Sequence, residues 1–130
     1  LCERAGAFFV AVAKEVQGFV TFSQFRGGMG YAHCVEHSIV IDPAAKSRGL
    51  GRALMVHAMA QAAMLGHHTM IAGVTGENTQ GRDFHAALGF ETVGILPQVG
   101  RKWGEWRDLV LMQKMLDPVA VGADISELGA

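Results

Sequence analysis

The chain has 130 residues, 50% of them hydrophobic, and a formal net charge of −1. This size and apolar fraction predict one domain with a sizeable core. The near-zero charge argues against nucleic acid as the main partner. No apolar run reaches the length of a membrane span, and no signal peptide is visible. Cys2 and Cys34 lack the spacing of a disulfide framework, which predicts a reducing, cytoplasmic compartment.

The first third of the chain is typical of paired strands. Residues 7–13 and 19–25 are rich in aromatic and β-branched side chains, and the polar segment between them ends in Gly18. Two such runs around a short polar turn predict an antiparallel hairpin. Residues 26–30 contain three glycines and predict a flexible loop after the hairpin.

A further strand is predicted over residues 35–41, where β-branched residues predominate. Successive side chains of a strand point to opposite faces of the sheet. Glu36 and His37 therefore cannot serve the same pocket, and His37 is expected to be a core or surface residue. The two predicted faces are Glu36, Ser38 and Val40 on one side, and Val35, His37, Ile39 and Ile41 on the other.

This strand ends near Asp42, and a short loop with Lys46 and Arg48 leads to a helix that opens at Arg52. A helix N-terminus presents unpaired backbone N–H groups and a partial positive charge. The succession of strand, basic loop and helix therefore suits a bound phosphate.

The first helix is predicted over residues 52–65, with Gly66 as its expected end. A buried strand over residues 69–75 should lead to a second helix over residues 79–88, which stops at Gly89. The predicted core stripe of the first helix consists of Leu54, Met55, Ala58, Met59, Ala62 and Leu65.

Two last strands are predicted over residues 91–96 and 108–115, around a basic loop that contains tryptophan. The whole pattern predicts an α/β (α+β) fold, with a mixed central sheet flanked by helices. We expect one domain over residues 1–116 and a peripheral C-terminal tail over residues 117–130.

Three kinds of phosphate-binding loop compete for the segment before the first helix. A Walker-type loop needs a hydroxyl side chain where this chain has Ala53. A dinucleotide-binding loop needs a third glycine where this chain has Leu54. The third kind fits better, because residues 46–54 resemble the pyrophosphate loop of the GNAT acetyltransferases, whose pattern is Gln/Arg-x-x-Gly-x-Gly/Ala.

Other motifs extend this resemblance over residues 7–115. The segment 77–90 is similar to the second helix motif of that superfamily, which ends in Gly-Phe. The segments 35–38, 96–100 and 100–108 are similar to the phosphinothricin and methionine sulfoximine N-acetyltransferase branch. The resemblance implies the GNAT fold. Family members also have an N-terminal strand and helices that help to form the acceptor pocket, and we expect this chain to lack them.

The chain departs from the family pattern at two positions. Lys46 replaces the usual Gln or Arg, which keeps the positive charge but loses the planar fork of a guanidinium. Gly81 stands where alanine or serine is common, which is expected to loosen the second helix by roughly 0.5–1 kcal/mol. Neither change removes a backbone donor, so we expect cofactor binding to survive both.

The resemblance implies acetyl-CoA as co-substrate. Asn78 would contact this cofactor, although an N-cap of the second helix explains an asparagine there equally well. The pantetheine arm would be held by backbone groups of Ile39, Val40 and Ile41. The pyrophosphate would be held by Ser47, Arg48, Gly49, Leu50, Gly51 and Arg52.

Acetyl transfer to an amine needs the amine to lose a proton, because its reference pKa is about 8 and only the neutral form attacks a thioester. Glu36 is the candidate base, directly or through water; the alternative is a solvated carboxylate at the end of a strand. His85 stands where many GNAT enzymes have a tyrosine, and it either protonates the departing thiolate or simply packs. Backbone N–H groups near Ile39 to Ile41 would meet the oxyanion.

Four residues are candidates for binding the acceptor. Arg26 and Tyr31 lie near the start of the central strand and suit a carboxylate. Lys102 and Trp106, in the basic loop, would line a site for a small zwitterion. Alternatively, Trp106 anchors the core and Lys102 is a solvated charge. His67 and His68 are adjacent and without ligand spacing, so no metal site is expected.

The resemblance therefore implies an N-acetyltransferase that transfers acetyl directly to the α-amine of a small amino acid or analogue, such as methionine sulfone, methionine sulfoximine or phosphinothricin. Nothing in the sequence resembles an activated cysteine or serine nucleophile. The alternatives are a non-catalytic acyl-CoA-binding module and a peptide or protein N-terminal acetyltransferase. The family habit implies a homodimer, and neither nucleic acid nor membrane is expected as a partner.

Overall fold

The computed structural model describes residues 7–12, 16–43 and 49–116. The predicted tail, residues 117–130, lies outside these described residues. The chain forms two compact units: the first consists of Leu1–Met70 and Met115–Ala130, and the second of Ile71–Lys114. Each unit has its own strands and one helix, and each is described by itself.

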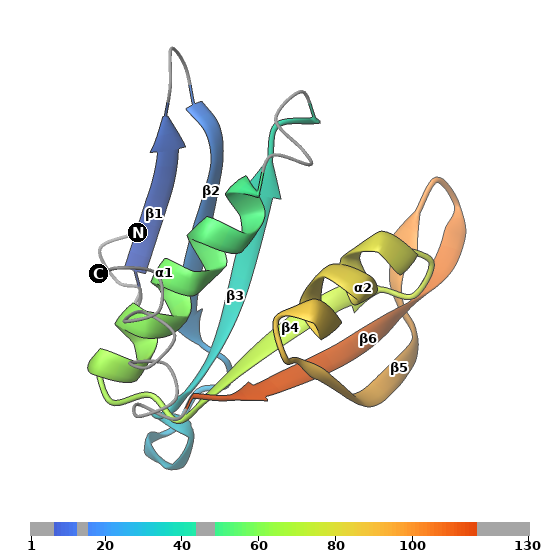
Figure 1. Ribbon diagram of the computed structural model, residues 1–130. Coiled ribbons are helices and arrows are strands. Elements are labelled where there is room, and N and C mark those ends of the chain that lie inside the picture. Colours follow the sequence, from blue (N-terminus) through green and yellow to red (C-terminus); the bar gives the residue numbers. More distant parts are fainter. Residues whose placement is uncertain (1–6, 13–15, 44–48, 117–130) are drawn as a thin grey trace. The chain divides into compact units, whose positions relative to one another are not determined.

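The first unit contains three neighbouring strands and a long helix. β1 pairs with β2 and β2 with β3, antiparallel in both cases, and α1 crosses these three strands (Figure 1). The predicted hairpin is confirmed, but Gly18 lies inside the second strand and not in the turn. The elements are β1 (Ala7–Val12), β2 (Val16–Gln24), a 3-10 helix (Met29–Tyr31), β3 (Cys34–Ile41) and α1 (Leu50–Met64).

The predicted apolar stripe of α1 is buried, with one exception. Leu65 is 55% exposed because it lies at the C-cap, beyond the last helical turn. Its assignment to the core was therefore wrong, whereas the predicted end of the helix at Gly66 is confirmed. The buried residues of α1 are Leu54, Met55, Ala58, Met59, Ala60, Ala62 and Ala63.

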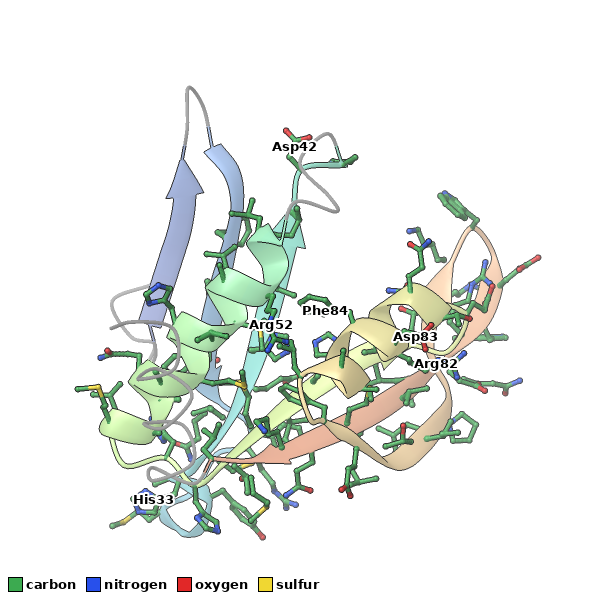
Figure 2. The ribbon with its side chains drawn as sticks, viewed as in Figure 1. His33, Asp42, Arg52, Arg82, Asp83 and Phe84 are labelled. Atoms are coloured by element: carbon green, nitrogen blue, oxygen red, sulfur yellow. The ribbon has the colours of Figure 1, made fainter. Side chains whose placement is uncertain are left out.

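The alternation predicted for β3 is confirmed. Val35 and His37 are buried, whereas Glu36 is half-buried and Ser38 is exposed. Across the β2–β3 pair, Ser23 lies opposite Glu36, so these two side chains share a face. Figure 2 shows the extent of the strand, with His33 at one end and Asp42 at the other.

The second unit contains three strands in the order β4–β6–β5, and one helix. β4 begins in the first unit and continues into the second, and it coincides with the strand predicted over residues 69–75. In the part of the chain that the structure describes, no helix is long and apolar enough to cross a membrane. The elements are β4 (Thr69–Thr75), α2 (Thr79–Ala87), β5 (Glu91–Lys102) and β6 (Glu105–Met115).

The last two strands are longer than predicted. The segment expected to be a basic loop continues the β5–β6 hairpin, and only Trp103 and Gly104 form the turn. Both have positive φ, 52° and 77°. The loop prediction was wrong because pairing with β6, which lies later in the chain, keeps a sequence rich in glycine and charge extended.

An irregularity interrupts this hairpin where Leu96 pairs with Leu109 and Gly100 with Arg107. The longer β5 side of the bulge contains Gln98, at a positive φ of 55°. Its backbone N–H donates to Asp108 Oδ1 at 3.0 Å. The Asp108 carboxylate therefore holds the bulge in place.

Candidate active site

Glu36 is the residue that the sequence analysis named as the candidate base. It is the third residue of β3 and is half-buried. This burial raises the pKa of its carboxyl above the ordinary value, because desolvation disfavours the charged form. A carboxylate with a raised pKa is a stronger base than a solvated one, which suits proton removal from an amine.

The backbone of β3 limits how Ile39, Val40 and Ile41 can serve a ligand. All three are paired with residues of β2, the first of them with Val20. Consecutive residues of a strand direct their N–H and C=O groups to opposite edges. Of the three residues, either Val40 alone or the two isoleucines can therefore offer backbone groups away from β2.

The N-terminus of α1 has the properties expected of an anion site. Gly49 is the N-cap in the left-handed region, with φ of 73°, and no described side chain caps the helix. The first turn carries no acidic residue, and Arg52 is exposed on it (Figure 2). Uncapped N–H groups beside an arginine favour a phosphate. Ser47 and Arg48, also predicted to bind the pyrophosphate, lie outside the described residues.

Arg26 and Tyr31 are brought together in the loop between β2 and β3. The guanidinium carbon of Arg26 lies 5.0 Å from the centre of the Tyr31 ring, in a cation–π contact. Gln24 shapes this loop, since its Nε2 donates to the carbonyls of Arg26 at 2.7 Å and Gly28 at 2.9 Å. Both candidate acceptor residues are exposed.

In the second unit, Asn78 is the N-cap of α2. Its Oδ1 accepts a hydrogen bond from the Gly81 N–H at 2.9 Å, so the N-cap prediction is confirmed. A Cβ on Gly81 would lie 2.5 Å from Asn78 Nδ2, which explains the glycine at this position. The cap leaves the Nδ2 hydrogens of Asn78 for another acceptor, so capping and cofactor binding are compatible.

His85 is buried in the same helix, with 6% of its surface exposed. Its Nδ1 lies 2.7 Å from the carbonyl oxygen of Gly81. Burial lowers the pKa of the imidazole, and the hydrogen bond to Gly81 raises it by a smaller amount. The ring packs edge-on against both Phe84 and Phe90.

The hairpin does not bring Lys102 and Trp106 together. Trp106 lies opposite Arg101 and forms a cation–π contact with it at 4.5 Å, whereas Lys102 lies over Trp103. Since Lys102 pairs with Glu105, in the neighbouring cross-strand pair, it points to the other face of the hairpin. Trp106 is 56% exposed, so the alternative that made it a core anchor was wrong.

Residues 1–90 of the chain match the acetyltransferase (GNAT) family. The chain belongs to the GNAT acetyltransferase family. This membership confirms the fold class predicted from the loop before α1 and from the helix that ends in Gly-Phe, and it makes the chain a GNAT acetyltransferase domain.

Named relatives narrow the branch of the family. An L-amino acid N-acyltransferase of Escherichia coli K12 is 39% identical over 120 residues, covering 87% of this chain and 70% of the relative. An L-methionine sulfoximine/L-methionine sulfone acetyltransferase of Salmonella typhimurium is 39% identical, covering 83% and 65%. A phosphinothricin N-acetyltransferase of Alcaligenes faecalis is 36% identical, covering 79% and 53%.

Solved GNAT structures agree with this fold. An acetyltransferase from Salmonella typhimurium with its cofactor acetyl-CoA superposes with a TM-score of 0.82 at 36% identity, covering 87% of this chain and 66% of that one. A phosphinothricin acetyltransferase from Sinorhizobium meliloti in complex with acetyl-CoA gives 0.79 at 35% identity, covering 84% and 60%. The chain thus spans about two thirds of the length of these two GNAT structures.

Some residues that shape this GNAT domain carried little sequence signal. Gln24 and Arg101 organise the two candidate acceptor segments, yet Gln24 lies in no recognisable motif and Arg101 occupies a variable position of the segment 100–108. Asp108 carries a further role, because its side chain anchors the bulge of β5. Its sequence signal was its place at the end of the segment 100–108, which resembles the phosphinothricin branch.

Proposed function

We propose that this domain transfers the acetyl group of acetyl-CoA to the α-amine of a small amino acid or of an oxidised or phosphinic analogue. The observation that carries the proposal is the continuity of β3 with α1. A half-buried Glu36 with a raised pKa lies on the strand whose far end leads to the N-terminus of α1 at Gly49, which no described side chain caps. The names of the relatives and the acetyl-CoA complexes of two neighbours support the same reaction.

In this mechanism, Glu36 removes a proton from the ammonium group of the acceptor, directly or through one water. The neutral amine attacks the thioester carbonyl and forms a C–N bond. Backbone N–H groups of the segment from Ile39 to Ile41 stabilise the oxyanion. The C–S bond then breaks, the electron pair leaves with the coenzyme A sulfur, and the nitrogen loses its second proton to solvent. The thiolate is a tolerable leaving group, because the pKa of an ordinary thiol is about 8.5.

Three groups of residues are proposed to contact the cofactor. Backbone groups of the segment from Ile39 to Ile41, those of either Val40 or the two isoleucines, serve the pantetheine arm, and residues 47–52 with their N–H groups serve the pyrophosphate. Asn78 is a further proposed contact, through Nδ2, since its Oδ1 is already used by the cap of α2. Lys46 and Arg52 add positive charge to the loop.

The acceptor carboxylate is assigned to Arg26, whose guanidinium is held in place by the ring of Tyr31. Lys102 and Trp106 remain proposed acceptor contacts, but from opposite faces of the hairpin, so only one of them faces a given acceptor. We further propose that the catalytic domain spans residues 1–116, that the protein acts as a homodimer, and that it works in the cytoplasm.

The decisive experiment measures release of the coenzyme A thiol by the full chain with a panel of acceptors. The panel contains methionine sulfone, methionine sulfoximine, phosphinothricin, ordinary amino acids and short peptides. We expect release with at least one of the first three and a loss of about 10²–10⁴-fold in Glu36→Gln.

The other outcomes each reject part of the proposal. Peptides that outcompete every amino acid would replace the acceptor class with a protein N-terminus. Acetyl-CoA binding without release for any acceptor would indicate a non-catalytic module. Full activity in Glu36→Gln would remove that residue from the mechanism.

A further inference from the structure

The imidazole of His85, in α2, packs between two aromatic rings. Its ring centre lies 5.1 Å from that of Phe84 and 5.2 Å from that of Phe90. In both pairs the ring planes are nearly perpendicular, at 89°. With two aromatic rings packed against it and 6% of its surface exposed, the imidazole has little freedom to rotate. Its orientation is therefore set by the fold.

The contact with Gly81 decides which nitrogen carries the hydrogen. A carbonyl oxygen only accepts hydrogen bonds, so the 2.7 Å contact requires a hydrogen on Nδ1 of His85. The opposite tautomer would place two lone pairs against each other at that distance. Because burial lowers the pKa of His85, the ring stays neutral at neutral pH. In that state Nε2 carries no hydrogen, and it can accept a proton but has none to donate.

The same glycine also holds Asn78. Its N–H donates to Asn78 Oδ1 at 2.9 Å, and a Cβ at this position would lie 2.9 Å from Asn78 Cγ. The side-chain amide thus lies directly against the backbone of Gly81. His85 bonds the carbonyl on one side of the Gly81 Cα, and Asn78 bonds the N–H on the other side. Because both peptide groups are joined at the Gly81 Cα, fixing the carbonyl of Gly81 also restrains its N–H.

We propose that His85 is a positioning residue, which holds the backbone of Gly81 and thereby directs the Nδ2 hydrogens of Asn78 outward, and which gives no proton to the departing thiolate. This inference rests on the proposed function, since Asn78 is there assigned to acetyl-CoA. It replaces the proton-donor role that the sequence left open for His85. The thiolate is then protonated by solvent.

Two conservative substitutions separate the roles. In His85→Asn, the side-chain amide nitrogen takes the place of Nδ1, so the bond to Gly81 is kept. In His85→Gln, a polar atom takes the place of Nε2, and the bond to Gly81 is lost. We expect His85→Gln to weaken acetyl-CoA binding, measured by calorimetry, about 3- to 10-fold, and His85→Asn to bind about as tightly as the wild type.

The kinetic constants give a second readout. A positioning residue raises KM for acetyl-CoA with a small change in kcat, whereas a lost proton donor lowers kcat about 10²–10⁴-fold in both variants. Asn78→Ala should weaken acetyl-CoA binding as well, and the double variant Asn78→Ala, His85→Gln should be no weaker than Asn78→Ala alone. Additive losses in the double variant would overturn the coupling.

The tautomer is measured without turnover. In ¹⁵N-labelled wild-type protein, with the ring assigned by correlation to its own backbone resonances, we expect a protonated Nδ1 and an unprotonated Nε2 for His85 at neutral pH. A protonated Nε2, or a doubly protonated ring, would overturn the inference even if both variants failed to fold. Because this spectrum and the calorimetry need no acceptor, they remain decisive if coenzyme A release is never observed, which would reject only the proposed reaction.

Discussion

The guanidinium of Arg107, on β6, forms an ion pair with the carboxylate of Glu77 in the turn between β4 and α2. A different nitrogen of the same guanidinium lies 3.2 Å from Oε1 of Glu105. The hydrogen bond from Arg107 to Glu77 is the first cause of the raised pKa of the guanidinium. One planar side chain therefore ties the turn before α2 to the hairpin, next to the bond from the Gly76 N–H to the Asp108 carbonyl at 2.9 Å.

Arg107→Lys should lower the melting temperature of the protein, because an ammonium group cannot engage two carboxylates in the fixed geometry of a guanidinium. The loss should shrink at high salt, since Glu77 is largely exposed and its pairing is screened. The matched control is Arg82→Lys on α2 (Figure 2), where the guanidinium makes only a long 3.4 Å contact with Thr79. Equal losses in the two variants would contradict the bridging role of Arg107.

Glu36→Gln should separate activity from stability. The pKa of Glu36 is raised in the folded protein, so the native state binds the proton more tightly than the unfolded chain. At low pH, the protonated Glu36 adds to the free energy of unfolding. This contribution is lost as the pH rises from the pKa of Glu36 in the unfolded chain to its pKa in the folded protein. Glutamine does not ionise and escapes this loss.

The measurement is urea unfolding over a series of pH values, from about pH 3, below the ordinary pKa of a glutamate, to about pH 8. Relative to the wild type, Glu36→Gln should gain stability between the lower and the higher pH, while its coenzyme A release falls. A relative loss of stability at the higher pH would show that the ionised carboxylate has a stabilising partner.

Gly81→Ala tests the close approach between Gly81 and Asn78. In an open helix this change adds about 0.5–1 kcal/mol of stability. Here the new Cβ displaces the Asn78 amide and breaks its N-cap hydrogen bond, which is worth about 1 kcal/mol. We therefore expect no net gain in the free energy of unfolding. Acetyl-CoA affinity should fall, whereas Gly94→Ala, which points into open space on β5, should leave it unchanged. A more stable Gly81→Ala protein with normal affinity would refute this role of the cap.

Gly49→Ala tests the left-handed residue that opens α1. At φ of 73°, an alanine costs about 1–2 kcal/mol, although its Cβ meets nothing within 4 Å. Asparagine tolerates this conformation, so Gly49→Asn should cost less in unfolding free energy. Gly30→Ala, in open space without a positive φ, is the neutral control.

The affinity of these variants for acetyl-CoA tests the anion site itself. If backbone N–H groups at the start of α1 hold the pyrophosphate, Gly49→Ala should weaken binding and Gly49→Asn should weaken it less. Identical affinities for all three variants would place the pyrophosphate elsewhere.

Sequence alone was sufficient wherever the physics is local. The apolar stripe of α1, the strand over residues 69–75, the helix end at Gly89 and the capping role of Asn78 all follow from periodicity and capping within a few residues. The alternation of β3 likewise assigns Glu36 and His37 to different faces, because neighbouring side chains of any strand point in opposite directions. The order of the motifs then predicted the GNAT family.

Only the tertiary structure decided what depends on strand pairing or on the exact positions of side-chain atoms. Strand pairing turned the predicted basic loop into hairpin, exposed Trp106, and separated it from Lys102. Packing of Asn78 against Gly81 explained a glycine that helix propensity alone marks as a weakness. The protonation of His85 was decided in the same way, because the tautomer of an imidazole depends on the acceptor opposite its Nδ1 and on burial by surrounding rings, neither of which a linear pattern specifies.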